Sequence, residues 1–165
     1  MIRSWLLLGA TGTAVAATGT SAIVSAGDII PTAMLALILL VLSAFFSSSE
    51  TALFSLQPVD VESMEGRGEH HVRRLLQEPR QTLASILIGN ETVNIALSTV
   101  TAALLLQLFP EKPWLNVIVI TPLLLVFGEV IPKTLAFRFG KNLAPHSAPI
   151  LAVFARVVAP IRFIL

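Results

Sequence analysis

A carboxylate and a proline lie close together inside a long apolar run, in the pentapeptide Gly128-Glu129-Val130-Ile131-Pro132. An ionisable side chain at bilayer depth costs at least ~2.5–3.5 kcal/mol on insertion scales, so its default interpretation is functional. Pro132 has no amide hydrogen, which leaves the C=O of Gly128 without its helical donor. The carboxylate of Glu129 and this carbonyl could therefore form half of a site for a hard cation.

Another apolar segment carries serines and a second glutamate. Ser43 and Ser47 are one helical turn apart and Glu50 lies three residues further on, so the three side chains fall near one face of a helix. Three roles for Glu50 remain open at this point. It could line a vestibule, act as the counter-ion of Lys133, or cap the polar segment that follows.

A third apolar segment carries two asparagines four residues apart. Asn90 and Asn94 lie directly above one another on a helix, and Ser98 and Thr101 extend the same stripe. The two carboxamides can offer two oxygen atoms to a common point. Glu91 points about 100° away from Asn90 around the helix, so we expect it to support the site or to contact a second subunit.

The polar residues of spanning helices commonly join helices to each other, at ~0.6 kcal/mol per hydrogen bond on average. A Glu129–Lys133 pair at i, i+4 is the chief structural alternative for the glutamate. However, three separate apolar segments carry oxygen acceptors near their middles, which favours a shared ion site. Hydroxyl, carboxamide, carbonyl and carboxylate oxygens suit Mg²⁺, Ca²⁺ or Na⁺ rather than zinc or copper, and Mg²⁺ and Na⁺ remain close rivals.

The elements that must position these residues are membrane helices. The chain has 165 residues, of which 55% are hydrophobic and 13% charged, a composition too apolar for a soluble domain of this size. Three segments, 29–53, 82–108 and 114–137, have the roughly 20 apolar residues that a spanning helix needs. The predicted fold class is therefore an all-α membrane protein. The charges gather in two short stretches, which argues against nucleic acid as a partner.

The connection 57–81 predicts the orientation of the chain in the membrane. It is polar, has a loose helical pattern, and carries Arg67, Arg73, Arg74 and Arg80. The positive-inside rule places this helical connection in the cytoplasm, with the N-terminus outside and the C-terminus inside. We expect a multi-pass protein of the inner (plasma) membrane.

The two ends of the chain lie outside the three predicted spans. Residues 1–28 resemble a short secretory signal, and the alternative is an extracellular leader that stays attached. Residues 141–165 are apolar but interrupted by prolines and arginines, so we expect a juxtamembrane helix along the inner interface. Because the sequence stops within an apolar run, we expect it to continue into a longer protein.

Other chemistry finds little support. The chain has no cysteine, and His70-His71 has no third metal ligand at a suitable spacing, so we expect a solvated surface pair. The sequence contains neither a phosphate-binding G-x-x-x-x-G-K-[ST] loop nor the H-E-x-x-H and G-x-S-x-G motifs. We therefore do not expect an enzyme.

Taken together, the motifs in 43–52, 89–94 and 127–134 resemble the transmembrane domain of the CorC / cyclin M (CNNM) family of magnesium transporters. The resemblance covers roughly 31–165. It implies a homodimer with three spanning helices and juxtamembrane helices in each subunit, and a largely dehydrated Mg²⁺ in an inward-facing cavity. The ligands that it implies are Ser43, Asn90, Asn94, the carbonyl of Gly128, and Glu129. We expect supporting or structural roles for Ser47, Glu50, Glu91, Ser98, Pro132 and Lys133.

The resemblance also implies a cytosolic pair of CBS domains, which bind ATP and are absent from this sequence. The leading hypothesis is export of Mg²⁺ by alternating access, with coupling to Na⁺ left open. One alternative is a membrane anchor or magnesium sensor that transports nothing. Another is a Na⁺- or H⁺-coupled carrier of a different solute.

Overall fold

The computed structural model describes residues 29–64, 68–112 and 114–162, so the predicted leader 1–28 lies outside the described residues. The described elements are all helical. In chain order they are α2 (Ile29–Phe54), α3 (Pro58–Glu62), α4 (Glu69–Gln77), α5 (Pro79–Leu108), the π-helical η1 (Asn116–Ile120), α6 (Thr121–Leu125), the π-helical η2 (Val126–Val130) and α7 (Ile131–Arg162).

Three helical stretches in the described residues are long and apolar enough to cross a bilayer. They are Ile29–Phe54, Pro79–Leu108 and Asn116–Pro160. Large apolar side chains cover their outer faces, as at Ile30, Val41 and Ile95, which are 77%, 62% and 66% exposed. Such exposure suits contact with lipid rather than with water. Over the described residues, the prediction of an all-α protein with three helices able to span a membrane is confirmed, whereas the homodimer stays a prediction.

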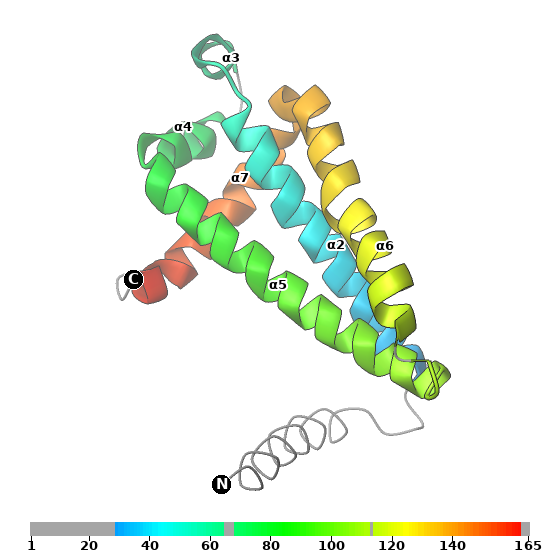
Figure 1. The fold of residues 1–165 in the computed structure, drawn as a ribbon. Coiled ribbons are helices and arrows are strands. Elements are labelled where there is room, and N and C mark those ends of the chain that lie inside the picture. The colour runs from blue at the N-terminus through cyan, green and yellow to red at the C-terminus, as the bar shows by residue number, and fades with distance from the viewer. Residues whose placement is uncertain (1–28, 65–67, 113, 163–165) are drawn as a thin grey trace, which may run out of the picture.

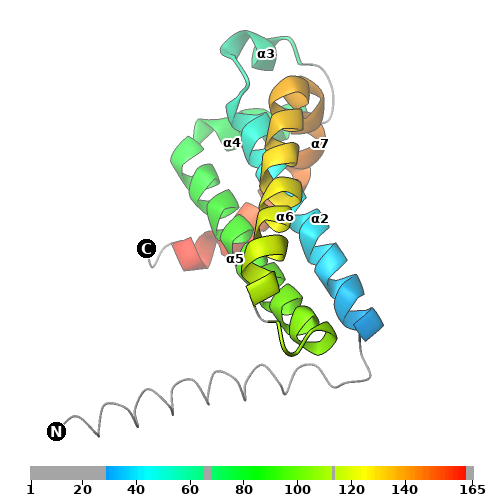
Figure 2. The same cartoon turned by 45° about the vertical axis from the view of Figure 1, so that its right-hand side comes forward.

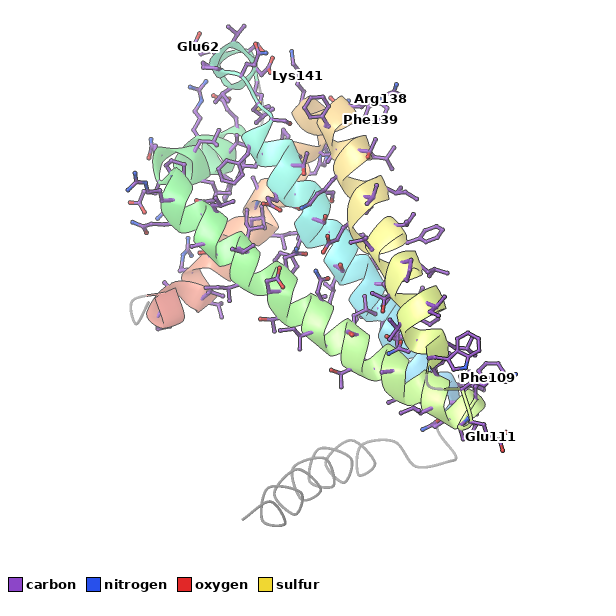
Figure 3. The ribbon with its side chains drawn as sticks, in the orientation of Figure 1. Glu62, Phe109, Glu111, Arg138, Phe139 and Lys141 are labelled. Carbon is purple, nitrogen blue, oxygen red and sulfur yellow. The ribbon has the colours of Figure 1, made fainter. Side chains whose placement is uncertain are left out.

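The helices cross at an angle (Figure 1), and α2, α5 and the continuous stretch from η1 to the first part of α7 run between the same two ends of the molecule in both views (Figure 2). One end carries the turn between α5 and η1, where Phe109 and Glu111 lie (Figure 3). The opposite end carries Arg138, Lys141 and α3. Charged side chains thus gather at the two ends, and the apolar faces lie between them.

The predicted end of the third span, residue 137, lies two residues before a bend in the helix. The helix continues as α7 to Arg162 and bends at Phe139, whose φ of −115° and ψ of 22° are not helical. Beyond the bend, α7 turns back behind α2 and α5 (Figure 1). Pro145 and Pro149 lie inside this helical part, where packing against neighbouring helices can stabilise a helix that contains prolines. The interfacial position expected for 141–165 stays a prediction.

Aromatic packing fixes the second half of α7 against the other two long helices. The rings of Phe46 and Phe154 meet edge to face, with centroids 4.9 Å apart. A side chain at Gly89 would not fit, because its Cβ would lie 2.7 Å from Phe46 and 2.8 Å from Phe154. Phe46 lies between Ser43 and Ser47 in the chain, and Gly89 precedes Asn90. This contact therefore supports the polar residues of α2 and α5 from behind.

Candidate metal centre

Hydrogen bonds between polar side chains join the three long helices at one point. The hydroxyl of Ser43 in α2 donates to Oδ1 of Asn94 in α5 at 2.6 Å. Nδ2 of Asn94 in turn donates to Oε1 of Glu129 in η2 at 2.8 Å. The Ser43 hydroxyl also lies 3.4 Å from the carbonyl oxygen of Gly128. The structure thus brings together four of the predicted ligands, from three different helices.

Gly128 and Glu129 lie on a π-helical turn, which the sequence analysis did not anticipate. The amide of Ile131 donates to the carbonyl of Val126, five residues earlier. This turn ends two residues before Pro132, and η1 likewise ends two residues before Pro122. The recurring proline is the signal that could have revealed both turns. Single π turns within α-helices are frequent at functional sites, because they redirect side chains and carbonyl groups.

Gly128 is buried, and its Cα faces the serine of α2. A Cβ at this position would lie 3.0 Å from Oγ of Ser43 and 3.6 Å from Cδ1 of Leu40. The absence of a side chain therefore allows the backbone of η2 to approach α2 closely. This approach places the Gly128 carbonyl beside the Ser43 hydroxyl.

Asn90 is buried at 4% exposure, and its Oδ1 has no hydrogen-bond partner among the described residues. Leaving a buried acceptor unsatisfied costs about 1–3 kcal/mol. Asn90 lies one helical turn before Asn94 on α5, so its oxygen belongs to the same stripe. It is an acceptor available to a ligand.

The supporting residues lie where α2 faces η2 and α7. The Ser47 hydroxyl lies 3.5 Å from the backbone oxygen of Glu129, and Pro132 is buried. Glu50 Oε2 lies 3.5 Å from Nζ of Lys133, so of the three open roles the structure shows the counter-ion. In the described part of the chain, Lys133 therefore pairs with Glu50, and the alternative Glu129–Lys133 pair is not formed.

On its other side, the cluster opens into a pocket of about 160 Å³ between α5 and the third span, lined in part by Asn94, Ser98 and Glu129. Thr121 also lines this pocket and was missed by the sequence analysis; its hydroxyl donates to the carbonyl of Asn116 at 3.1 Å. Glu91 is exposed, and its expected subunit contact stays a prediction.

Histidines do not contribute to this centre. The rings of His70 and His71 lie edge to face in α4, with centroids 5.9 Å apart. Across the residues that the structure describes, no three side chains of His, Cys, Asp or Glu come together. The cluster between the long helices instead combines one carboxylate with hydroxyl, carboxamide and backbone oxygens. These are the donors that hard cations prefer.

Comparison with known proteins gives consistent matches. Residues 34–165 match the family model described as the cyclin M transmembrane N-terminal domain. A UPF0053 protein of Haemophilus influenzae is 33% identical over 148 residues, which is 84% of this chain and 34% of that relative. The UPF0053 inner membrane protein YfjD of Escherichia coli is 31% identical over 75% of this chain and 30% of its own length. The metal transporter cnnm-1 of Caenorhabditis elegans is 27% identical over 76% of this chain and 16% of its own length. This chain therefore spans about a third of the length of these two bacterial relatives and a smaller share of the length of the animal one.

Proposed function

This chain belongs to the cyclin M (CNNM) transmembrane-domain family, and from that premise we propose that it transports Mg²⁺ through the polar cluster between its three long helices. The metal transporter cnnm-1 supports transport of a metal as the function. The proposed ligands are Ser43, Asn90, Asn94, the carbonyl of Gly128, and Glu129.

The spacing of the oxygen and nitrogen atoms carries the proposal. Mg²⁺ binds six oxygens at 2.0–2.1 Å in an octahedron, so neighbouring ligand oxygens lie about 3 Å apart. In this structure two oxygen–oxygen separations are comparable, 2.6 Å between Ser43 Oγ and Asn94 Oδ1 and 3.4 Å between Ser43 Oγ and the Gly128 oxygen. The third contact, 2.8 Å, joins Nδ2 of Asn94 to Oε1 of Glu129 and brings that carboxylate beside the two oxygens. A small ion could enter between these atoms with only local movement of side chains. The five proposed ligands would leave one position for water.

Binding requires two of the existing hydrogen bonds to break. The Ser43 hydroxyl must turn its hydrogen away from Asn94 before both oxygens can face a cation. Glu129 must exchange the amide of Asn94 for the ion. The Oδ1 of Asn90 has no such bond to lose among the described residues. Because these hydrogen bonds satisfy most of the polar atoms of the cluster, the helices can remain packed when the ion leaves, as transport requires.

Flux into liposomes tests this proposal. Purified protein is reconstituted, and Mg²⁺ entry is followed with an enclosed fluorescent indicator. We expect flux from the wild type, none above background from Asn94→Ala, and wild-type flux from Thr99→Ala. Thr99 is a suitable control because it lies on the same helix, is exposed, and its hydroxyl donates to the carbonyl of Ile95 within that helix. Equal flux from wild type and Asn94→Ala would overturn the proposal.

One observation favours a second candidate, a membrane anchor or magnesium sensor that transports nothing. The Ser43–Asn94–Glu129 hydrogen bonds already join three helices without an ion, as structural polar contacts do. That function predicts a lower melting temperature for Asn94→Ala and no Mg²⁺ flux from any variant or from the wild type. The same liposome measurement therefore separates the two candidates.

Export, coupling to Na⁺ and assembly are finer parts of the same proposal. An imposed Na⁺ gradient should accelerate Mg²⁺ movement in the opposite direction if the two ions are exchanged. Other solutes, tested as competitors of Mg²⁺ flux, distinguish a carrier of a different cargo.

We further propose a homodimer with its C-terminal end in the cytoplasm, where a CBS-domain pair of the full-length protein would follow. Accessibility of single cysteines to an impermeant reagent tests the orientation.

A further inference from the structure

A second polar pocket lies between α4, the start of α5 and the second half of α7, and it shares no lining residue with the pocket beside the proposed ion site. Its volume is about 270 Å³. The charged side chains that line it are Arg74, Glu78 and Arg156. Neither arginine forms an ion pair among the described residues, and both are exposed. The pocket thus presents two unneutralised guanidinium groups against one carboxylate.

Small side chains make the room in this pocket. Ala152, Ala155 and Ala159 of α7 line it, and their spacing places them on one face of the helix. The opposite wall is held in place by Thr82, whose hydroxyl donates to the carbonyl of Leu75 at 2.8 Å and joins α5 to α4. The N-terminal end of α5 lies beside the pocket and adds a favourable potential for an anion.

The face of α7 next to the pocket is apolar and uncovered. Ile150, Val153 and Val157 are 57%, 61% and 68% exposed. At 100° per residue, Arg156 falls between this stripe and the face that carries Ala155 and Ala159. Going around this one helix, the pocket face comes first, then Arg156, then the apolar stripe. The headgroup, the phosphate and the acyl chains of a phospholipid follow one another in the same order.

We propose that this pocket binds the headgroup of an anionic phospholipid, with the phosphate between Arg74 and Arg156 and the acyl chains along Ile150, Val153 and Val157. Arginine suits this role because its planar group forms paired hydrogen bonds with phosphate oxygens. Basic pockets between helices at the membrane surface recognise lipid headgroups in this way. The apolar stripe favours a lipid over a soluble phosphate, because a soluble phosphate has no acyl chains to cover it.

A neighbouring hollow extends the basic surface. Its volume is about 360 Å³, and it is lined by His70, Arg73, Arg74 and Gln77, two of which also line the first pocket. Arg73 is neutralised by Glu69 at 2.7 Å, so Arg74 remains the charge that the two hollows share. Binding of a lipid here would join α4 to the second half of α7. The inference does not depend on which ion the protein transports.

Native mass spectrometry of the protein with lipids tests the inference. The protein in neutral detergent is incubated with phosphatidylglycerol and phosphatidylcholine of identical acyl chains. We expect the wild type to retain phosphatidylglycerol preferentially, and Arg74→Gln and Arg156→Gln each to reduce that retention about fivefold. Arg156→Lys, which keeps the charge but not the paired hydrogen bonds, should retain more of the preference than Arg156→Gln. Arg80→Gln is the matched control, because Arg80 is exposed at the same end of α5 and does not line the pocket.

Three results would overturn the inference. Equal retention of the two lipids by the wild type would show that the pocket has no preference for an anionic headgroup. An equal loss in Arg80→Gln would show general attraction to a basic surface. Displacement of phosphatidylglycerol by inorganic phosphate or glycerol phosphate would identify a site for soluble anions. Unchanged circular dichroism of each variant checks that the substitutions leave the fold intact.

Discussion

At the scale of single residues, Asn94 holds the candidate metal centre together, because its carboxamide bonds to α2 through oxygen and to η2 through nitrogen. Glu129 has no lysine or arginine within ion-pair distance among the described residues. Its carboxylate accepts a hydrogen bond from the Asn94 amide instead. Such a carboxylate favours a cation strongly. The nearby Lys133 does not supply one, since Glu50 engages it from the opposite helix.

This arrangement predicts an indirect role for Glu50. In Glu50→Gln, Lys133 loses its partner and can turn toward Glu129, which is one helical turn away on the same face. Its ammonium group would then compete with Mg²⁺, and we expect the Mg²⁺ affinity to fall about twofold. Titration calorimetry measures this change. The double variant Glu50→Gln/Lys133→Gln should bind Mg²⁺ at least as tightly as the wild type, and a further loss in the double variant would contradict the explanation.

At the scale of elements, the π turn η2 determines which groups face the centre. Pro132 supplies no amide hydrogen to the preceding turn, and the carbonyl of Gly128 lies beside Ser43. Serines, small residues and a proline are poor choices for a stable helix taken alone. Their positions are explained if α2 and η2 must approach closely and leave an oxygen atom free for a ligand.

Restoring the missing donor should weaken the site. In Pro132→Ala the turn can return to α-helical spacing, in which the new amide bonds to the Gly128 carbonyl. We therefore expect weaker Mg²⁺ binding and a higher melting temperature, because proline within a helix costs about 3 kcal/mol. Pro122→Ala is the matched control, since Pro122 follows the other π turn and is exposed. It should raise the stability without changing the affinity. Unchanged Mg²⁺ affinity in Pro132→Ala would show that the freed carbonyl is not a ligand.

The helical elements were predictable from the sequence to different degrees. Apolar length alone predicted the three spans, and turn spacing put Asn90 above Asn94 and the serines of α2 on one face. The π turns were not predictable in this way, because an inserted residue in a turn changes register without changing composition. The bend at Phe139 and the contact between Phe46 and Phe154 depend on packing between distant segments, which no local pattern contains.

At the scale of the whole molecule, the second half of α7 is held by contacts at both ends. Phe154 packs on Phe46 at one end, and near the bend Nζ of Lys141 lies 2.6 Å from Oδ1 of Asp60 in α3. The hydrogen bond from Lys141 lowers the pKa of Asp60 below its ordinary value of 3.8, and the backbone amide of Gln57 lowers it further. The charged carboxylate therefore stabilises the attachment of α3 to α7.

This attachment makes stability depend on pH in a defined direction. Because the pKa of Asp60 is lowered in the folded state, its contribution is complete above the ordinary value of 3.8 and is lost as the pH falls through the folded pKa. We expect the melting temperature of the wild type to fall below about pH 4 more steeply than that of Lys141→Gln. Parallel curves for the two proteins, measured by thermal unfolding in detergent, would contradict this role of the pair.

The central claim is that oxygen atoms from three helices bind one Mg²⁺, and calorimetric titration of the purified protein with Mg²⁺ tests it most directly. One variant is taken from each helix: Ser43→Ala, Asn94→Ala and Glu129→Gln. We predict that Ser43→Ala and Asn94→Ala each weaken Mg²⁺ binding by about 10–100-fold. Glu129→Gln, which removes the negative charge, should weaken it by more, and Thr99→Ala should leave it unchanged. Wild-type affinity in Ser43→Ala, Asn94→Ala or Glu129→Gln would show that the corresponding helix supplies no ligand at that position, and wild-type affinity in all three would contradict the account.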